Sequence, residues 1–215
     1  MRKLNRPVAP KPLSKYNYNH KEWSDLTARD KKSIWYSLNN MQNGYCCYCD
    51  SVAVRGNGHI EHFFNKGTKN YKNLTFNWDN LFGSCGFQSG DTCGHYKDRM
   101  GASGPGNYDP KNLIKPDVEN PSLFFYFLPT GTIKVNDSLT LAEKARAYET
   151  IRVINLDDGA LNSARYKRIK TIQKEILNLY SLTQDVAMIK QELAKIRSIV
   201  LKGEYQSAVL SALGL

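Results

Sequence analysis

The chain has 215 residues, of which 41% are hydrophobic and 23% are charged, an ordinary balance for a globular protein. It contains no apolar run of about 18 residues and no apolar segment behind its basic N-terminus, so we expect a cytoplasmic protein with neither a membrane span nor a secretory signal. The formal net charge of +10 favours a polyanionic partner such as nucleic acid, although many basic proteins bind none.

The first part of the chain is predicted to be a basic arm followed by a helix. Residues 1–21 are rich in Lys, Arg and Pro, a composition typical of an extended arm or of a flexible tail. Residues 22–43 are predicted to be helical because apolar side chains recur there at helical spacing, namely Trp23, Leu26, Ile34, Trp35, Leu38 and Met41. We expect this stripe to pack in the core of a unit that spans residues 22–121.

All five cysteines and three of the four histidines lie within residues 46–95. Cys46 and Cys49 form a C-x-x-C pair, a spacing that lets both thiolates reach one zinc ion. Cys85 and Cys93 supply a second pair, and the glycines between them allow the loop to fold back. Cys47 is left over and is predicted to be a buried thiol. Without a secretory signal, a structural zinc site explains the cluster better than disulfides do.

Glu61 and His62 lie between the two cysteine pairs. Neighbouring residues on a strand point to opposite faces, so one of the two can hold a divalent cation while the other addresses a water molecule. Histidine is a suitable base near neutral pH, and a hard cation such as Mg²⁺ prefers carboxylate oxygen. An isolated Glu-His pair would be interpreted as a polar surface pair, but the flanking cysteines favour catalysis. The zinc knuckle that fixes Cys93 also fixes His95, which is predicted to complete the cation site.

Other polar residues surround this segment. Asn80 precedes the second cysteine pair and is predicted to hydrogen-bond its own loop and so to orient it. A group of basic residues could contact phosphates, although each one by itself is typical of a solvated surface charge: Lys66, Lys69, Lys72, Lys97 and Arg99.

Residues 122–215 are predicted to form a β-hairpin and a helical region, after a linker rich in Gly and Pro at 101–121. Residues 122–136 suit a hairpin that turns near Pro129–Gly131. Thr140 and Glu143 form a capping-box pattern, and a break is expected at 157–159. Two apolar stripes follow, which could pack internally or dock a partner: Ile169, Ile172, Ile176 and Leu179, then Val186, Ile189, Leu193, Ile196 and Val200.

Several stretches together resemble the PtuB family within the HNH, or ββα-metal, endonuclease superfamily. They cover roughly residues 1–170 and are residues 2–7, Cys46-Cys47-Tyr48-Cys49-Asp50, Gly58-His59-Ile60-Glu61-His62-Phe63, Trp78-Asp79-Asn80-Leu81-Phe82, Cys93-Gly94-His95-Tyr96-Lys97-Asp98 and residues 145–156. Two features depart from the common pattern. Cys85 and Cys93 are widely spaced, and Gly94 stands where many members have His or Asn.

The resemblance implies an α+β fold with a zinc-stapled ββα-metal core, an N-terminal helix and a C-terminal helical region. It implies that Glu61 and His95 are ligands of a catalytic Mg²⁺ or Mn²⁺, that His62 is the general base and that Asn80 braces the loop. It leaves the role of His59 open.

The resemblance also implies a role in bacterial defence against phages, in a Septu or a retron system, together with an ABC/SMC-like ATPase of the PtuA type. A retron setting would add a reverse transcriptase and its reverse-transcribed DNA. We expect hydrolysis of DNA, with RNA as an open alternative. The competing hypotheses are a zinc module that binds nucleic acid without cutting it, and a scaffold subunit for the ATPase.

Overall fold

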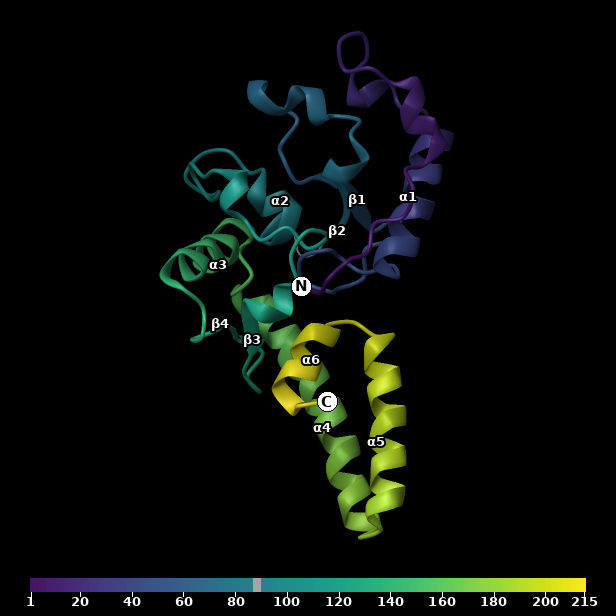
Figure 1. Ribbon diagram of the computed structural model, residues 1–215, viewed down its shortest axis with the longest axis vertical. Coiled ribbons are helices and arrows are strands. Elements are labelled where there is room, and N and C mark those ends of the chain that lie inside the picture. The colour runs from purple at the N-terminus through teal and green to yellow at the C-terminus, as the bar shows by residue number, and fades with distance from the viewer. Residues whose placement is uncertain (87–89) are drawn as a thin grey trace.

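The computed structural model describes residues 1–86 and 90–215 and combines helices with two small antiparallel sheets (Figure 1). The first sheet pairs β1 (Gly58–His62) with β2 (Leu81–Cys85), and the second pairs β3 (Phe125–Phe127) with β4 (Ile133–Val135). This mixture agrees with the α+β class. The loop that was expected to fold back between the second pair of cysteines lies partly outside the described residues, at 87–89.

Helix α1 (Ala28–Gln42) begins six residues later than the helix predicted over 22–43 because Thr27 caps it, accepting a hydrogen bond from the backbone of Asp30. Trp23 instead lies in a short 3-10 turn, Trp23–Asp25, and is half-buried. The remaining stripe residues on α1 are buried as predicted, and the helix packs against β2. The helix ends where Asn43 adopts a left-handed backbone conformation.

The N-terminal arm is extended, but it is held against the body of the protein rather than being a loose tail. Leu4 is buried and its backbone N–H donates to the carbonyl of Pro116, at 2.8 Å. Arg6 donates to Asp117 at 2.8 Å, and its guanidinium lies 4.4 Å from the ring centre of Phe82. The arm therefore connects the linker to β2.

The C-terminal half follows the local signals in the sequence. The second hairpin turns at residues 128–132, where Gly131 has a φ of +84°. Helix α3 (Leu141–Ile154) starts with the capping box of Thr140 and Glu143. Helix α4 (Gly159–Leu182) starts after the expected break, and Asp158 caps it.

Helices α4 and α5 (Val186–Leu201) form an antiparallel pair that projects from the body, and α6 (Gln206–Leu213) returns against α4 and β3 (Figure 1). Ile169 and Ile172 are buried, so this part of the first stripe packs internally. In the second stripe Val200 is buried whereas Val186 is exposed. No helix within 1–86 and 90–215 is both long enough and apolar enough to cross a bilayer.

Candidate metal centre and active site

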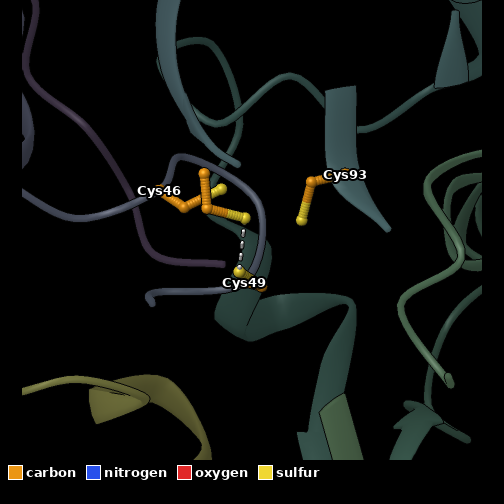
Figure 2. A group of neighbouring side chains, drawn as sticks. Cys46, Cys49 and Cys93 are labelled. Atoms are coloured by element: carbon orange, nitrogen blue, oxygen red, sulfur yellow. Dashed lines mark hydrogen bonds between the residues drawn. The ribbon is translucent and has the colours of Figure 1, made fainter. Parts of the chain in front are cut away.

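Four cysteine side chains meet in one buried place. Cys46 and Cys49 come from the turn after α1, Cys85 is the last residue of β2, and Cys93 is the first residue of α2 (Cys93–Lys97). Their sulfur atoms all lie within 4.8 Å of one another, and Figure 2 shows three of them pointing into a common space. Within 1–86 and 90–215, no other set of three or more His, Cys, Asp or Glu side chains brings its ligand atoms as close together.

The donor atoms fit a tetrahedral metal ion. Zinc–thiolate bonds of about 2.3 Å place the sulfurs of such a site about 3.8 Å apart. The Sγ atoms of Cys49 and Cys85 are 3.6 Å apart, and all five cysteines are free thiols. The four sulfurs could therefore hold a metal ion such as zinc. Cys47 is buried outside this set, and its backbone N–H donates to the carbonyl of Gly83, which ties the turn to β2.

The cluster needs positive charge in order to ionise fully. Burial raises the pKa of the Cys49 and Cys93 thiols. Burial also acts to raise the pKa of Cys46, but hydrogen bonds from the neighbouring thiols outweigh it and lower that pKa. One thiolate is thus stabilised by the thiols around it, and a bound cation would be required to stabilise the others.

Arg165 of α4 brings a positive charge toward this cluster from the C-terminal half. It is 1% exposed, and its guanidinium donates to the carbonyl of Leu156 at 2.7 Å and to Oδ1 of Asn162 at 3.0 Å. None of the ion pairs within the described residues involves it. Burial lowers the pKa of Arg165, while the charges of Cys49 and Cys93 raise it. A buried charge needs an opposite charge nearby, and the cysteine cluster can supply it.

Glu61 on β1 is the centre of a second buried cluster beside the first. Its Oε1 accepts hydrogen bonds from Nζ of Lys97, at 2.9 Å, and from the hydroxyl of Tyr48, at 3.2 Å. Burial acts to raise the pKa of Glu61, but the Lys97 ammonium and His59 outweigh it and bring the pKa to about 2. The carboxylate is therefore ionised at neutral pH and able to bind a cation.

His59 and His95 lie on the same side of the hairpin as Glu61. Nε2 of His59 is 3.3 Å from Oε2 of Glu61, and the ring centres of His59 and His95 are 4.0 Å apart. Nδ1 of His59 is buried and has no hydrogen-bond partner. His95 is exposed overall, but partial burial of its ring and, to a smaller extent, the charge of His59 lower its pKa. Strand alternation explains the pairing of His59 with Glu61, because they are two residues apart.

Gly94 explains how α2 comes so close to these side chains. A Cβ atom at this position would lie 2.3 Å from Oε2 of Glu61 and 2.7 Å from Nε2 of His59, far inside normal contact. Glycine at position 94 is therefore a steric requirement of this arrangement.

His62 lies on the other face of β1, away from Glu61. Its Nε2 is 3.0 Å from the carbonyl oxygen of Thr75, and its ring meets that of Trp23 edge-on, with centres 4.5 Å apart. A carbonyl only accepts, so Nε2 carries the proton and Nδ1 is left as the basic nitrogen. Burial lowers the pKa of His62 to about 4, which keeps the ring neutral at pH 7. Glu61, His59 and His95 thus lie together on one side of β1, and His62 lies on the opposite side.

Asn80 is buried and braces the long loop between β1 and β2. Its Oδ1 accepts from the backbone N–H of Phe64 at 2.7 Å, and its Nδ2 donates to the carbonyls of Phe64 and Leu74, at 3.0 and 3.1 Å. All the donors and acceptors of the amide group are directed at the loop, so the side chain shapes the site without facing a substrate.

The basic residues predicted to contact phosphate are in different surroundings. Lys66 and Lys72 line a surface hollow, Lys69 is exposed, and Arg99 donates to the carbonyl of Gly90 at 2.6 Å. Lys97 differs from the prediction. Its ammonium is fully buried and is bound to Glu61 and Asp98, so it is a partner of the acid rather than a surface contact.

The sequence analysis did not assign three residues to the cluster around Glu61: His59, Gly94 and Lys97. The alternation of His59 with Glu61 along β1 was a usable signal, since both residues fall on one face of the strand. The roles of Gly94 and Lys97 depend on how α2 packs onto β1, which no local pattern reveals.

Neither a search against models of known protein families nor a search of curated proteins finds a match to this chain.

Proposed function

We propose that this protein is a metal-dependent endonuclease of the HNH type, with structural zinc in the four-cysteine site. The observation that carries the proposal is the succession of β1, β2 and α2 around a buried, ionised Glu61, with His59 and His95 beside it and the cysteine cluster adjoining. This layout supports the resemblance to the PtuB family, which rests on the sequence motifs.

Ligands for a divalent cation lie around Glu61, although their ligand atoms do not converge as closely as the four sulfurs do. The carboxylate is ionised, and the orphaned Nδ1 of His59 belongs to a ring that already contacts it. Glu61, His59 and His95 would hold the ion, which supplies positive charge to the scissile phosphate and the departing oxygen. Two imidazoles beside one carboxylate suit Mn²⁺ better than Mg²⁺, because Mg²⁺ prefers oxygen ligands.

The remaining steps of the proposed reaction are carried out by side chains of the protein. His62 is the proposed general base: Thr75 fixes its tautomer, so Nδ1 can take a proton from water while the water oxygen attacks phosphorus and the 3′ oxygen leaves. Lys97 fixes the Glu61 carboxylate relative to the strand, since its Nζ binds Glu61 at 2.9 Å and donates to the backbone carbonyl of His62 at 3.1 Å. Asn80 holds the loop that follows the base.

Cleavage of plasmid DNA with Mn²⁺ or Mg²⁺ tests the proposal. His62→Ala should lower the rate by about 10²- to 10⁴-fold, the usual contribution of a general base. His20→Ala is the matched control, because His20 is the exposed histidine outside the Cys/His segment. Binding of DNA without cleavage by any preparation would favour the alternative, a zinc module that does not cut. A rate unchanged in His62→Ala would remove His62 from the mechanism.

The family resemblance extends the proposal to a setting, namely defence against phages together with a PtuA-like ATPase. The assay is therefore run with the isolated chain and with the ATPase complex, with and without ATP, on phage DNA and on cellular RNA. Activity that depends on the complex supports this setting. Copurification of the ATPase with the chain, lost when surface residues of α4 and α5 are changed, would assign the projecting helices to the partner.

A further inference from the structure

Two hollows lie on either side of the loop that follows β1. The first has a volume of about 460 Å³ and lies between this loop and the turn before α1. Trp23 forms part of its wall, together with Lys21, Lys66 and Lys72, and the only acidic residue in its lining is Glu22. The first hollow is thus positive and has an aromatic ring in its wall.

The second hollow, of about 550 Å³, lies between the same loop and residues 97–111. Tyr71 and Tyr108 provide aromatic rings, while Arg99 and Lys111 provide positive charge. Two acidic residues also line it, Asp98 and Asp109, and Asp98 is already paired with Lys97. Asn65 lines both hollows, so they adjoin at that residue.

Each hollow is lined by residues that contact Glu61 or His62, the proposed catalytic pair on β1. In the first, Trp23 lies edge-on to His62, and Thr75 provides both part of the lining and the carbonyl that holds the His62 ring. In the second, Lys97 is the partner of Glu61. A chain lying across both hollows would therefore pass next to Trp23, Thr75 and Lys97, which contact His62 and Glu61.

We propose that the two hollows form one groove that binds single-stranded nucleic acid, with a base stacked on Trp23 and phosphates held by Lys66, Lys72 and Lys111. Alternating basic and aromatic side chains are the usual means of holding unpaired strands, because each exposed base offers a flat face to stack. A duplex keeps its bases stacked on one another and cannot offer that face. The inference rests on the proposed function, since it places the strand at Glu61 and His62.

Binding is measured by fluorescence anisotropy with a labelled oligothymidylate of about 20 nucleotides, a duplex of equal length and an RNA oligomer, without added divalent cation. We expect the single strands to bind at least about tenfold more tightly than the duplex. Trp23→Leu should weaken single-strand binding roughly 5- to 150-fold, the range for loss of one base–aromatic stack. Trp23→Phe retains an aromatic ring and should recover most of the affinity.

The charge contribution is tested with a matched pair of variants. Lys66→Ala/Lys72→Ala removes two charges from the first hollow, and Lys190→Ala/Lys195→Ala removes two exposed charges from α5. Only the first pair should reduce binding and its dependence on salt. Equal losses from both pairs would overturn the groove, because the effect would then come from net charge alone.

The outcomes separate this inference from the proposed function. Tighter binding of the duplex, or unchanged binding by Trp23→Leu, overturns the groove even if plasmid is cleaved. Selective binding of single strands that depends on Trp23 supports the groove, and lack of cleavage by the same preparation would then count against the nuclease alone. The RNA and DNA arms decide which sugar the groove accepts.

Discussion

Replacement of Gly94 by Ala tests the packing of α2 on β1 directly. Alanine is favoured over glycine within helices by about 1 kcal/mol, so local propensity alone predicts a more stable protein. The structure predicts the opposite. The new Cβ would lie 2.3 Å from Oε2 of Glu61 and 2.7 Å from Nε2 of His59, more than about 1 Å inside ordinary contact.

The expected loss of stability depends on how far the Glu61 side chain can move away from the new methyl group. Glu61 is held by Lys97 at 2.9 Å and by Tyr48 at 3.2 Å, so it cannot retreat without weakening a buried ion pair. Overpacking costs about 1–3 kcal/mol, and full loss of one partner of a buried pair costs about 3–5 kcal/mol. If the new methyl group displaces Glu61 from Lys97, the cost of about 3–5 kcal/mol less the gain of about 1 kcal/mol in helix propensity lowers the free energy of unfolding by roughly 2–4 kcal/mol.

The measurement is urea unfolding of the metal-loaded protein, with the midpoint and slope fitted for each variant. Gly159→Ala is the control, because Gly159 is the first residue of α4 and a Cβ there meets nothing within 4 Å. A chain of this size should also lose about 4–16 °C in Tm. If Gly94→Ala is as stable as Gly159→Ala, α2 does not lie against Glu61 as described, and the proposed cation site loses its basis.

Three further predictions concern residues that hold the cysteine cluster and the loop after β1 in place. Cys93→Ser should abolish stoichiometric zinc in metal analysis, whereas Cys47→Ser should keep it; full zinc in Cys93→Ser would exclude a four-thiolate site. Arg165→Met should lower the free energy of unfolding by about 1–3 kcal/mol, because the buried carbonyl of Leu156 loses its donor, and an unchanged urea midpoint would contradict this. Asn80→Ala removes the partner of the part-buried N–H and carbonyl of Phe64, while the Leu74 carbonyl keeps the N–H of Asn77, so roughly 2 kcal/mol should be lost; wild-type stability would show that water replaces the amide.

Features set by neighbouring residues could be predicted from the sequence. The capping box at Thr140, the break before Gly159 and the hairpin turn at Gly131 were all expected, and the structure has them. Cys46 and Cys49 were expected to share a metal with the second cysteine pair, and the four sulfurs do converge. In each case short-range backbone geometry, or a strong and specific ligand chemistry, limits the possible arrangements.

Which residues surround Glu61 was decided by tertiary packing. Lys97 has the sequence properties of a surface cation but is buried against Glu61, and Gly94 resembles a weak helix residue until β1 is placed beside it. Trp23 carries the apolar signal of a core stripe, yet its ring borders a hollow because α1 begins only after Thr27. The physical reason is that periodicity and spacing constrain residues close in the chain, whereas burial, charge pairing and steric exclusion depend on which distant elements come into contact.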